Sequence, residues 1–467
     1  MPIDAPLTFG QLSTWRSVET FAADRLAEVN VFDTCDLRSL PGLRTDTVLE
    51  ALRCLTEEHE ALRTTYHLVD GRPVQRVHPW LEPRVQVLDR AQNGPLEPAA
   101  VTARLAAEPF QVTGDPGWRA VLGTDGDRAL FLSLSLSHLV VDVTAVRILQ
   151  DRLLELAAHP GGPRAAAARP GPAPRELALV QQGDAWRSRR EGADKYWRRV
   201  LAGSPPRNLP AAPPRDGERR IHARLTSHSL ARLAAQAAKA HGVSPQSVYT
   251  AMTAAALAGL VGRDRVLLSL MCANRFDPAW QPMVSTMNQL VPVVCDAKPE
   301  ATLVQHLKRT HLNALLSYRH GAYDVDRAEE LARQSPQDAD GRGFEHDCWF
   351  NYVDGIPGPG GDPQQSAQLA WIEPARHAGH PFYARVNADS ADWAALALRV
   401  DPDLIPADEV LRALRTIVRG IHRAVTDPDS TLGSLAAAET SADPEPLPAG
   451  LFPPDHAESR DPALVAA

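Results

Sequence analysis

Residues 128–143 read R-A-L-F-L-S-L-S-L-S-H-L-V-V-D-V and carry the clearest structural pattern in the chain. Leucines at 132, 134 and 136 alternate with serines at 133, 135 and 137, which predicts a half-buried strand, because successive side chains of a strand point to opposite faces. A helix is expected directly after it, since Asp142 or Thr144 can cap its first turn and apolar residues then recur every three or four positions. A strand that leads at once into a helix favours a mixed α/β, or α+β, fold.

His138 and Asp142 form an H-x-x-x-D pattern at this strand–helix junction. Such a junction holds an imidazole at a fixed position, and an imidazole with an ordinary pKa near 6.5 is suited to act as a general base. The alternative is a hydrogen-bonded core histidine, because His138 lies on the strand face that carries the three leucines. A pattern of two residues does not by itself decide between these interpretations.

Helices and strands continue to alternate along the rest of the chain. Ser244, which precedes a proline, predicts a helix start, and Gly262 predicts the end of that helix. Strands are expected at residues 266–270 and 396–400, and an amphipathic helix is expected at 409–425.

Proline-rich segments mark the expected domain boundaries. The stretch S-P-P-R-N-L-P-A-A-P-P-R-D-G at 204–217 predicts a linker, because closely spaced prolines remove backbone donors and favour an extended path. The sequence therefore indicates an N-terminal domain at 1–203 and a C-terminal domain at 218–442. Residues 443–467 are again rich in proline and poor in apolar pattern, and we expect them to be disordered.

The composition excludes several classes of function. Lys and Arg total 49 against 57 Asp and Glu, a net charge of −8, which has the wrong sign for a nucleic-acid or anionic-membrane binder. Five scattered cysteines and the histidine spacing supply neither a disulfide framework nor a metal-ligand set, so no metal site is expected. The sequence opens without a basic and apolar leader and contains no apolar run of about eighteen residues, which predicts a cytoplasmic protein without membrane partners.

Several motifs, in the same order, resemble those of the condensation domains of nonribosomal peptide synthetases, within the chloramphenicol-acetyltransferase-like superfamily. L-T-F-G-Q-L-S-T-W at 7–15 resembles the family's L-x-x-x-Q-x-x-x-W, and E-H-E-A-L-R-T-T-Y at 58–66 resembles its R-H-E-x-L-R-T-x-F. Residues 137–143 fall where the family carries H-H-x-x-x-D-G, and Y-W-R-R-V-L-A-G at 196–203 resembles its Y-W-x-x-x-L-x-G. A-N-R at 273–275 stands for a later G-x-R or x-G-R element, so the resemblance extends over almost the whole chain.

The resemblance implies an α+β fold of two chloramphenicol-acetyltransferase-like subdomains, arranged as a V-shaped pseudo-dimer with a central tunnel. It also implies acyl transfer, in which a donor thioester on the phosphopantetheine arm of an acyl or peptidyl carrier protein is attacked by an amine or, as a second choice, an alcohol. The acceptor is a small molecule or is itself carrier-bound, and the protein binds no cofactor of its own. His138 takes the place of the family's functional histidine, and Asp142 and Arg275 take the place of a structural ion pair. Backbone N–H groups at the start of the following helix are expected to stabilise the oxyanion.

Three residues depart from the family's motifs, and we expect all three to line the substrate tunnel or the oxyanion site. Ser137 replaces the first histidine of the motif. Val143 replaces the glycine at the helix entrance, where a β-branched side chain narrows the tunnel or changes the local conformation. Gln289 stands at the usual asparagine position of V-S-T-M-N-Q-L-V-P at 284–292.

Two functions from different classes follow. No adenylation motif and no carrier-protein serine segment remains in the sequence, which predicts a freestanding acyltransferase of antibiotic or other secondary metabolism that meets its carrier protein in trans. The alternative is a catalytically silent module that keeps the fold and recruits a carrier-bound peptide or a tailoring enzyme. The three altered residues motivate the silent module, whereas the retained His138, Asp142 and Arg275 favour the enzyme.

Overall fold

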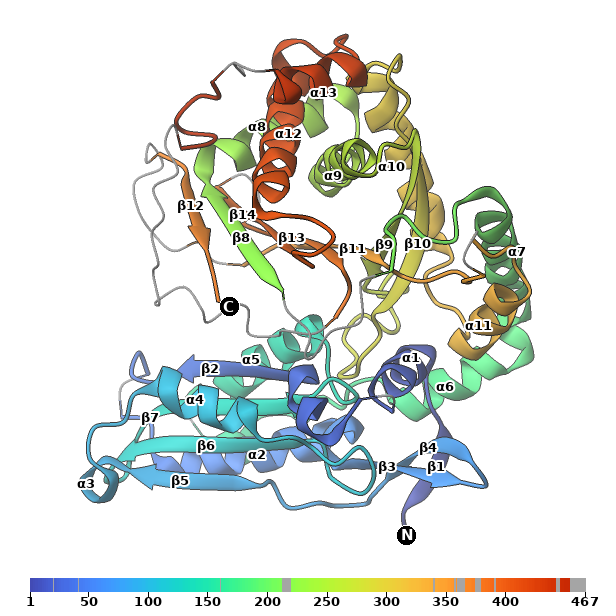
Figure 1. Ribbon diagram of the computed structural model, residues 1–467. Coiled ribbons are helices and arrows are strands. Elements are labelled where there is room, and N and C mark those ends of the chain that lie inside the picture. Colours follow the sequence, from blue (N-terminus) through green and yellow to red (C-terminus); the bar gives the residue numbers. More distant parts are fainter. Residues whose placement is uncertain are drawn as a thin grey trace. The chain divides into compact units, whose positions relative to one another are not determined.

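The computed structural model describes residues 1–19, 21–40, 42–159, 161–211, 220–338, 341–356, 358, 366–373, 379–389, 392–441 and 446–453. The chain falls into two compact units (Figure 1). Unit 1 comprises Met1–Glu191, Ala273–Gln289 and Ala322–Val325, and unit 2 comprises Gly192–Cys272, Leu290–Gly321 and Asp326–Ala467. Helices pack on sheets in both units, so the predicted α+β fold is confirmed.

The described residues of unit 1 form a three-stranded sheet, in the order β1-β4-β3, and a four-stranded sheet, in the order β2-β7-β6-β5. The strands are β1 (Ile3–Pro6), β2 (Asn30–Asp36), β3 (Thr64–Val69), β4 (Arg72–Val77), β5 (Val85–Asp89), β6 (Trp118–Asp125) and β7 (Arg128–Ser137). The helices are α1 (Phe9–Val18), α2 (Thr45–Glu58), α3 (Arg90–Asn93), α4 (Pro98–Ala107), α5 (Val143–Ala158) and α6 (Pro174–Gln182). Short 3₁₀ helices lie at Ala23–Val29, Glu60–Arg63, Pro163–Ala165 and Asp184–Trp186.

Strand β7 is buried on both faces, whereas its alternating pattern predicts burial on one face only. Leu132, Leu134 and Leu136 pack with α2 and α5 in the main core of unit 1. Helix α4 covers the opposite face (Figure 1), where the hydroxyl oxygens of Thr102 and Ser133 lie 2.7 Å apart in a hydrogen bond. The half-buried prediction is therefore wrong, because the serine hydroxyls of this strand are buried against a helix instead of facing solvent.

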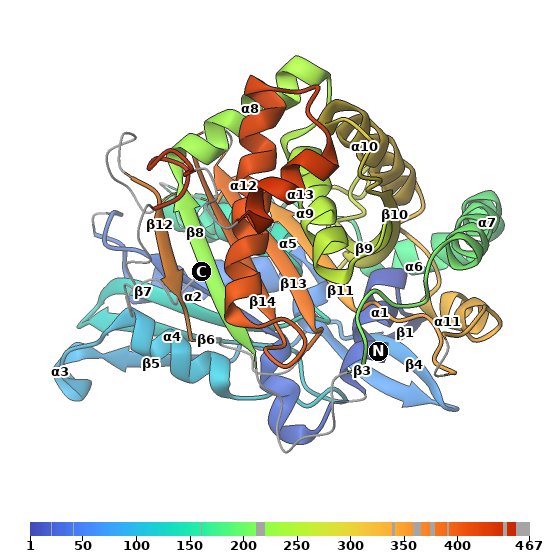
Figure 2. The same ribbon diagram turned by 45° about the horizontal axis from the view of Figure 1, so that its top comes forward.

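The described residues of unit 2 form a seven-stranded sheet in the order β10-β9-β11-β13-β14-β8-β12. Its strands are β8 (Ile221–Ser227), β9 (Arg265–Cys272), β10 (Gln289–Asp296), β11 (Cys348–Val353), β12 (Gln368–Trp371), β13 (Phe382–Asp389) and β14 (Trp393–Val400). Its helices are α8 (His228–His241), α9 (Pro245–Val261), α10 (Leu303–Arg319), α11 (Val325–Arg333), α12 (Ala407–Thr426) and α13 (Leu432–Thr440), and α7 (Arg187–Gly203) begins in unit 1 and continues into unit 2. Figure 2 shows α8, α9 and α12 together on one side of this sheet.

The local signals for unit 2 correctly predict its elements. Ser244 caps α9 by accepting a hydrogen bond from the Ser247 N–H, and Gly262 ends the helix with a φ of 61°, a left-handed conformation that glycine adopts without strain. The predicted strands at 266–270 and 396–400 lie within β9 and β14, and the predicted helix at 409–425 lies within α12. Capping and periodicity are local properties, which is why the sequence alone reveals them.

The two units do not divide at the predicted domain boundary. The division falls between Glu191 and Gly192, inside α7, and not at residue 203. Two segments from the C-terminal half, residues 273–289 and 322–325, belong to unit 1. Val284, in the first of these segments, is buried in the main core of unit 1, so apolar packing holds the segment there.

The described parts of the predicted linker and tail are packed against unit 2. In the linker, the backbone N–H groups of Asn208 and Leu209 donate to the Asp347 carboxylate at 2.7 and 2.9 Å. In the tail, Leu451 and Phe452 are buried in the core of unit 2. Residues 204–211 are non-helical, as predicted, but they lie within unit 2 instead of linking two domains, and a disordered tail is wrong for residues 446–453. Residues 212–217, 443–445 and 454–467 of these predictions lie outside the described residues.

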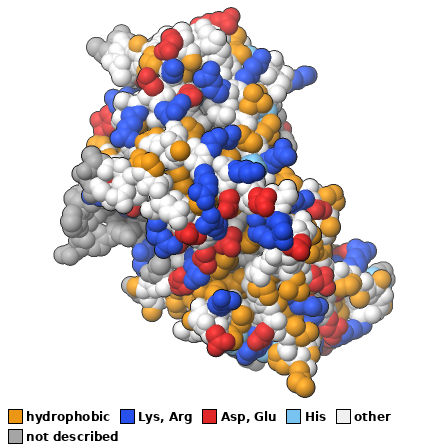
Figure 3. Space-filling view, turned by 90° about the vertical axis from the view of Figure 1, so that its right-hand side faces the viewer, with side chains coloured by type: hydrophobic (Ala, Val, Ile, Leu, Met, Phe, Trp, Pro, Cys, Tyr) orange, Lys and Arg blue, Asp and Glu red, His pale blue; other side chains and the backbone are white. Residues whose placement is uncertain are grey.

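None of the described helices is both long enough and apolar enough to span a membrane. On the face drawn in Figure 3, basic and acidic side chains are interspersed. This distribution agrees with a modest net charge of −8.

Buried neutral histidines are expected to make the protein sensitive to acid. Burial lowers the pKa of His59 in unit 1 and of His346 in unit 2 from 6.5 to about 4. The unfolded chain therefore binds more protons than the folded chain between these values, so stability is complete above pH 6.5 and is lost as the pH falls toward 4. Each histidine contributes up to about 3 kcal/mol to this loss. Urea unfolding at a series of pH values measures it, and His346→Gln should reduce the slope in this window; an unchanged slope would contradict the assignment.

Candidate functional site

His138 lies in the turn that joins β7 to α5, and neighbouring residues hold this turn in place. The Ser137 carbonyl accepts hydrogen bonds from the N–H groups of Val140 and Val141 at 2.9 and 3.3 Å. The Tyr66 hydroxyl donates to the Leu139 carbonyl at 2.8 Å, and burial raises the pKa of Tyr66, so the hydroxyl stays protonated. The side chains at 139, 140 and 141 are buried, which anchors the turn and leaves the His138 side chain half-buried beside it.

Asp142 caps α5 and pairs with Arg275, as the family resemblance implies. Its Oδ1 accepts from the Ala145 N–H and from Arg275 Nη2, both at 2.8 Å, and its Oδ2 accepts from Arg275 Nη2 at 3.0 Å and from the Met287 N–H at 3.1 Å. The Asp142 and Arg275 side chains are 5% and 8% exposed, so the ion pair is shielded from water. These hydrogen bonds hold two backbone N–H groups and the Arg275 guanidinium in place, so Asp142 has a positioning role.

Arg275 also organises the segment that follows it. Its Nη1 donates to the carbonyl oxygens of Gln281 and Met283 at 2.9 and 2.8 Å, and its Nη2 donates to the Ser285 carbonyl at 3.0 Å. One guanidinium therefore ties residues 281–287 to the start of α5 through Asp142. This arrangement explains why the segment belongs to unit 1 although it lies more than a hundred residues beyond α5 in the sequence.

The segment brings Thr286 and Asn288 to the imidazole of His138. The Thr286 hydroxyl donates to Asn288 Oδ1 at 2.7 Å, and its oxygen lies 3.4 Å from His138 Nδ1. Because the single hydroxyl proton is given to Asn288, the Thr286 oxygen is left to accept a proton from Nδ1. This chain of hydrogen bonds selects the Nδ1–H tautomer and leaves Nε2 as the basic nitrogen. Sequence reasoning missed Thr286 and Asn288, although both stand in the quoted motif at 284–292.

Close backbone packing holds Thr286 in this position. Gly10 in α1 lies directly against it, and a Cβ atom on Gly10 would come within 2.6 Å of the Thr286 carbonyl oxygen. The Thr286 side chain is fully buried. Glycine is thus required at position 10 for α1 to approach this closely.

Gln289, which the sequence analysis expects at the substrate tunnel or oxyanion site, is buried and hydrogen-bonded at both ends of its amide. Its side chain is 2% exposed, its Nε2 donates to the Tyr323 carbonyl at 2.8 Å, and its Oε1 accepts from the Tyr323 N–H at 3.4 Å. Both ends of the amide are used to hold residues 322–325 in unit 1. A longer side chain in place of the expected asparagine reaches this neighbouring backbone.

Ser137 and Val143 keep the local geometry regular. Ser137 Oγ accepts from the Leu139 N–H at 3.3 Å and so supports the turn. Val143 is the first residue of α5 and is 41% exposed, so its β-branched side chain neither distorts the capped helix start nor fills the core. The N–H groups of Val143 and Thr144 precede the first intrahelical hydrogen bond and lie at the positive end of the helix dipole.

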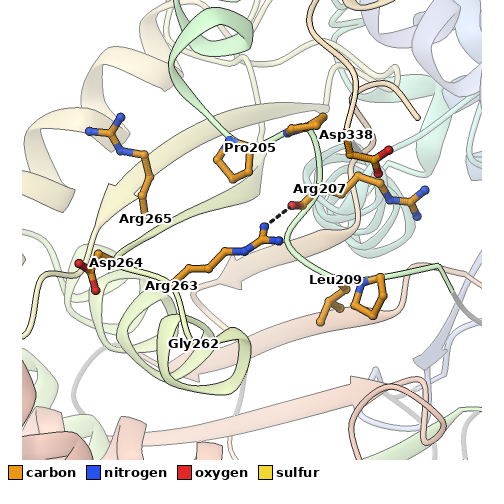
Figure 4. A pocket seen from close by; sticks show the side chains of 10 residues that line it. Pro205, Arg207, Leu209, Gly262, Arg263, Asp264, Arg265 and Asp338 are labelled. Carbon is orange, nitrogen blue, oxygen red and sulfur yellow. Dashed lines mark hydrogen bonds between the residues drawn. The ribbon is translucent and has the colours of Figure 1, made fainter. Parts of the chain in front are cut away.

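A separate pocket of about 730 Å³ lies in unit 2, between the described part of the proline-rich segment and the turn after α9 (Figure 4). Its arginines are already paired: Arg263 donates to the Arg207 carbonyl at 2.8 Å, Arg207 pairs with Glu345, and Arg265 pairs with Asp296. The described residues that line it include no histidine, serine, threonine or cysteine. We therefore take the His138 turn as the candidate site.

The condensation-domain family model matches residues 33–376. Phosphinothricin tripeptide synthetase PhsB of Streptomyces viridochromogenes is 31% identical over 350 residues, which cover 71% of this chain and 29% of the synthetase. The chain spans less than a third of the length of this synthetase and of the beauvericin and enniatin synthetases that it also matches.

Solved structures show the same fold. The condensation domain of the Monacolin K polyketide synthase MokA aligns with a TM-score of 0.70 at 17% identity and covers 92% of this chain and 99% of that domain. The X-domain in its complex with OxyB from teicoplanin biosynthesis aligns with a TM-score of 0.69 at 19% identity and covers 93% of this chain and 96% of that chain. At these identities the likeness establishes the fold alone.

Proposed function

This chain belongs to the condensation-domain family, and on that premise we propose that it is an acyltransferase that joins a carrier-bound acyl thioester to an amine or, as a second choice, to an alcohol. The observation that supports this most directly is the hydrogen-bond chain from His138 through Thr286 to Asn288, which leaves Nε2 as a base. The acyl donor is held on the phosphopantetheine arm of an acyl or peptidyl carrier protein, supplied in trans. The acceptor is a small molecule or a second carrier-bound group.

In the proposed reaction, the acceptor nitrogen or oxygen attacks the thioester carbonyl carbon while His138 Nε2 takes the proton that the nucleophile loses. The carbonyl π electrons move to the oxygen, and the N–H groups of Val143 and Thr144 donate to the resulting oxyanion. The intermediate then collapses, the C–S bond breaks, and the proton on Nε2 passes to the departing thiolate. The products are an amide or ester and the free thiol of the arm, so the base is regenerated in each turnover.

The ion pair supports this chemistry without taking part in the proton transfer. Both Asp142 oxygens accept hydrogen bonds from Arg275 and from backbone N–H groups, and none of these bonds involves His138. Asp142 therefore fixes the start of α5, and Arg275 fixes the segment that carries Thr286. Together they fix the position of the base relative to the oxyanion donors.

The test uses an acyl-loaded carrier protein mixed with the full chain and a panel of amines and alcohols, followed by intact-mass spectrometry of the carrier. Unloading that depends on both protein and acceptor, with formation of the joined product, is the expected result. The amine and alcohol series distinguish amide from ester formation. Absence of turnover across several donors would contradict the proposal.

The second candidate is the catalytically silent recruitment module, which the replacement of motif residues by Ser137 and Val143 favours. It predicts tight binding of a carrier-bound peptide or of a tailoring enzyme without turnover. The same loaded-carrier experiment, read as binding by size-exclusion chromatography, separates the two functions.

Thr286→Val should reduce turnover while leaving substrate affinity close to that of the wild type. Valine keeps the shape but removes the hydroxyl that accepts from Nδ1, so the tautomer with a basic Nε2 loses its support. A hydrogen bond worth about 1 kcal/mol corresponds to a roughly fivefold fall in kcat. Thr286→Ser, which keeps the hydroxyl, is the matched control and should restore most of the rate. Equal loss in both variants would assign Thr286 to packing alone.

A further inference from the structure

Helix α10 of unit 2 carries apolar residues on two opposite sides, of which one is buried. On the buried side, Leu303 and Leu307 lie in the core of unit 2, and the helix packs beside α9 (Figure 2). On the other side, Leu312 and Leu315 are 65% and 52% exposed. Neighbouring exposed leucines rimmed by polar residues are typical of a surface that meets another molecule.

Helical spacing places the two leucines in a stripe with two basic residues. Lys308, Leu312, Leu315 and Arg319 follow one another at intervals of four, three and four residues, the spacing that puts side chains on the same face of an α-helix. At a rise of about 1.5 Å per residue, the stripe is roughly 17 Å long. The leucines therefore form its middle, and each end carries a positive charge.

The basic residues of the stripe are not neutralised within the described part of the chain. Lys308 and Arg319 are exposed, and neither forms an ion pair with a described residue. Helix α10 itself contains no acidic residue. Arg309, beside the stripe, lies 3.8 Å from a carboxylate oxygen of Asp296, so the acidic group nearest to this helix is already shared with a different arginine.

Helix α7 adds a third basic residue at the C-terminal end of the stripe. The Tyr196 ring of α7 stacks on His320, the residue after α10, with ring centroids 5.2 Å apart. The guanidinium carbon of Arg199, which is exposed, lies 5.3 Å from the centre of the Tyr196 ring. Burial, with the charges of Arg319 and Arg199, lowers the pKa of His320, because both guanidinium groups are close to this imidazole. Two arginines thus lie at one end of the stripe.

We propose that this α10 face, formed by Lys308, Leu312, Leu315 and Arg319 with Arg199 of α7, docks an acidic amphipathic helix of the carrier protein that holds the acyl donor. The inference rests on the proposed function, in which a carrier supplies the thioester in trans. A helix laid along the stripe places its apolar side chains against the two leucines and its carboxylates against the basic ends. All five residues belong to unit 2.

The charge of the whole chain supports this choice of partner surface. A net charge of −8 repels an acidic protein at long range, so association with one needs a local surface of the opposite sign. The small apolar area predicts a weak and transient complex, which suits a carrier that leaves after each transfer. A lipid surface fits less well, because α10 is held in the core by its other side and this stripe offers two leucines for insertion.

The test measures docking apart from chemistry. A holo acyl carrier protein and a holo peptidyl carrier protein, each labelled with a dye at the N-terminus, are titrated with the full chain, and fluorescence anisotropy gives Kd. Lys308→Glu and Leu315→Ser should each raise Kd at least about tenfold, since one repels carboxylates and the other removes an apolar contact. Both positions are exposed, so the melting temperature should stay close to that of the wild type.

The matched control is Lys239→Glu on α8, an exposed lysine of the same unit whose reversal changes the net charge by the same amount. It should leave Kd within about twofold of the wild-type value. Higher ionic strength should weaken wild-type binding more than binding by Lys308→Glu. No binding of either carrier by the wild type, or wild-type affinity in both α10 variants, would overturn the proposal.

Turnover separates this inference from the proposed function. With an acyl-pantetheine thioester, which has no carrier protein, Lys308→Glu should react at the wild-type rate, whereas with the carrier-bound donor its KM should rise about tenfold at an unchanged kcat. If the wild type bound the carrier through the α10 face but transferred neither acyl group, the proposed function would fail and the docking surface would stand. Normal transfer with unchanged KM in both α10 variants would have the opposite meaning.

Two other occupants are outcomes of the same experiment. Flotation with phosphatidylcholine vesicles that contain phosphatidylserine tests a membrane, and analytical ultracentrifugation tests a second copy of this chain. Vesicle binding that Leu315→Ser abolishes would assign the face to a lipid surface. A dimer that the same variant dissociates would assign it to self-association. Either result would overturn the assignment to a carrier protein.

Discussion

A His138→Ala variant is expected to lose about 10²- to 10⁴-fold in kcat/KM for acyl transfer, the range that a positioned general base contributes. Without Nε2, the proton of the attacking nucleophile has no acceptor on the protein. The turn itself is held by Tyr66 and by the buried residues at 139–141, so the variant is expected to fold. Initial rates of carrier unloading, followed by intact mass, measure the effect.

The matched control is His159→Ala, at the C-terminal end of the same helix α5. It removes an imidazole from unit 1 away from the turn and should change the rate by less than about twofold. Thermal unfolding of both variants separates lost chemistry from lost structure. If His138→Ala retained a rate close to that of the wild type with normal stability, the proposed base would be wrong.

An Asp142→Ala variant is expected to destabilise the protein by about 3–5 kcal/mol, because it leaves the guanidinium of Arg275 buried without its carboxylate. The same change removes the cap of α5 and the acceptor of the Met287 N–H. The free energy of unfolding from urea titration measures the loss. Turnover should fall as well, since the segment that carries Thr286 is held through this pair.

A double-mutant cycle shows whether the ion pair itself is responsible. Asp142→Asn combined with Arg275→Met should cost less than the sum of the two single variants, since the double variant leaves no unpaired buried charge. The exposed pair Arg38–Asp36 is the control, and Arg38→Ala should leave the free energy of unfolding close to that of the wild type, because water screens exposed charges. Additive single effects, or an Asp142→Ala effect as small as this control, would contradict a buried structural pair.

The fold was predictable where the signal is local. The capping serine at 244, the left-handed glycine at 262 and the periodic helix at 409–425 each involve residues within a few positions of one another, and all three predictions are confirmed. The half-buried strand failed at Ser133 because the partner of that hydroxyl is Thr102 in α4, which the alternating pattern does not reveal. The predicted domain boundary at the proline-rich linker failed because Asp347, distant in sequence, accepts hydrogen bonds from its backbone and holds it in unit 2.

The candidate site also combines features that the sequence predicts with features that depend on tertiary contacts. The sequence by itself indicated the proposed base, His138 at the end of a strand, and Asp142 as the cap of the next helix; through the family's motif order it also indicated Arg275 as the partner of Asp142. Only the tertiary structure decided the tautomer of His138 and the buried role of Gln289, because Thr286 lies 148 residues from the histidine and Tyr323 lies 34 residues from the glutamine. Local backbone preferences are encoded in neighbouring residues, whereas the environment of a side chain depends on contacts that form when distant segments fold together.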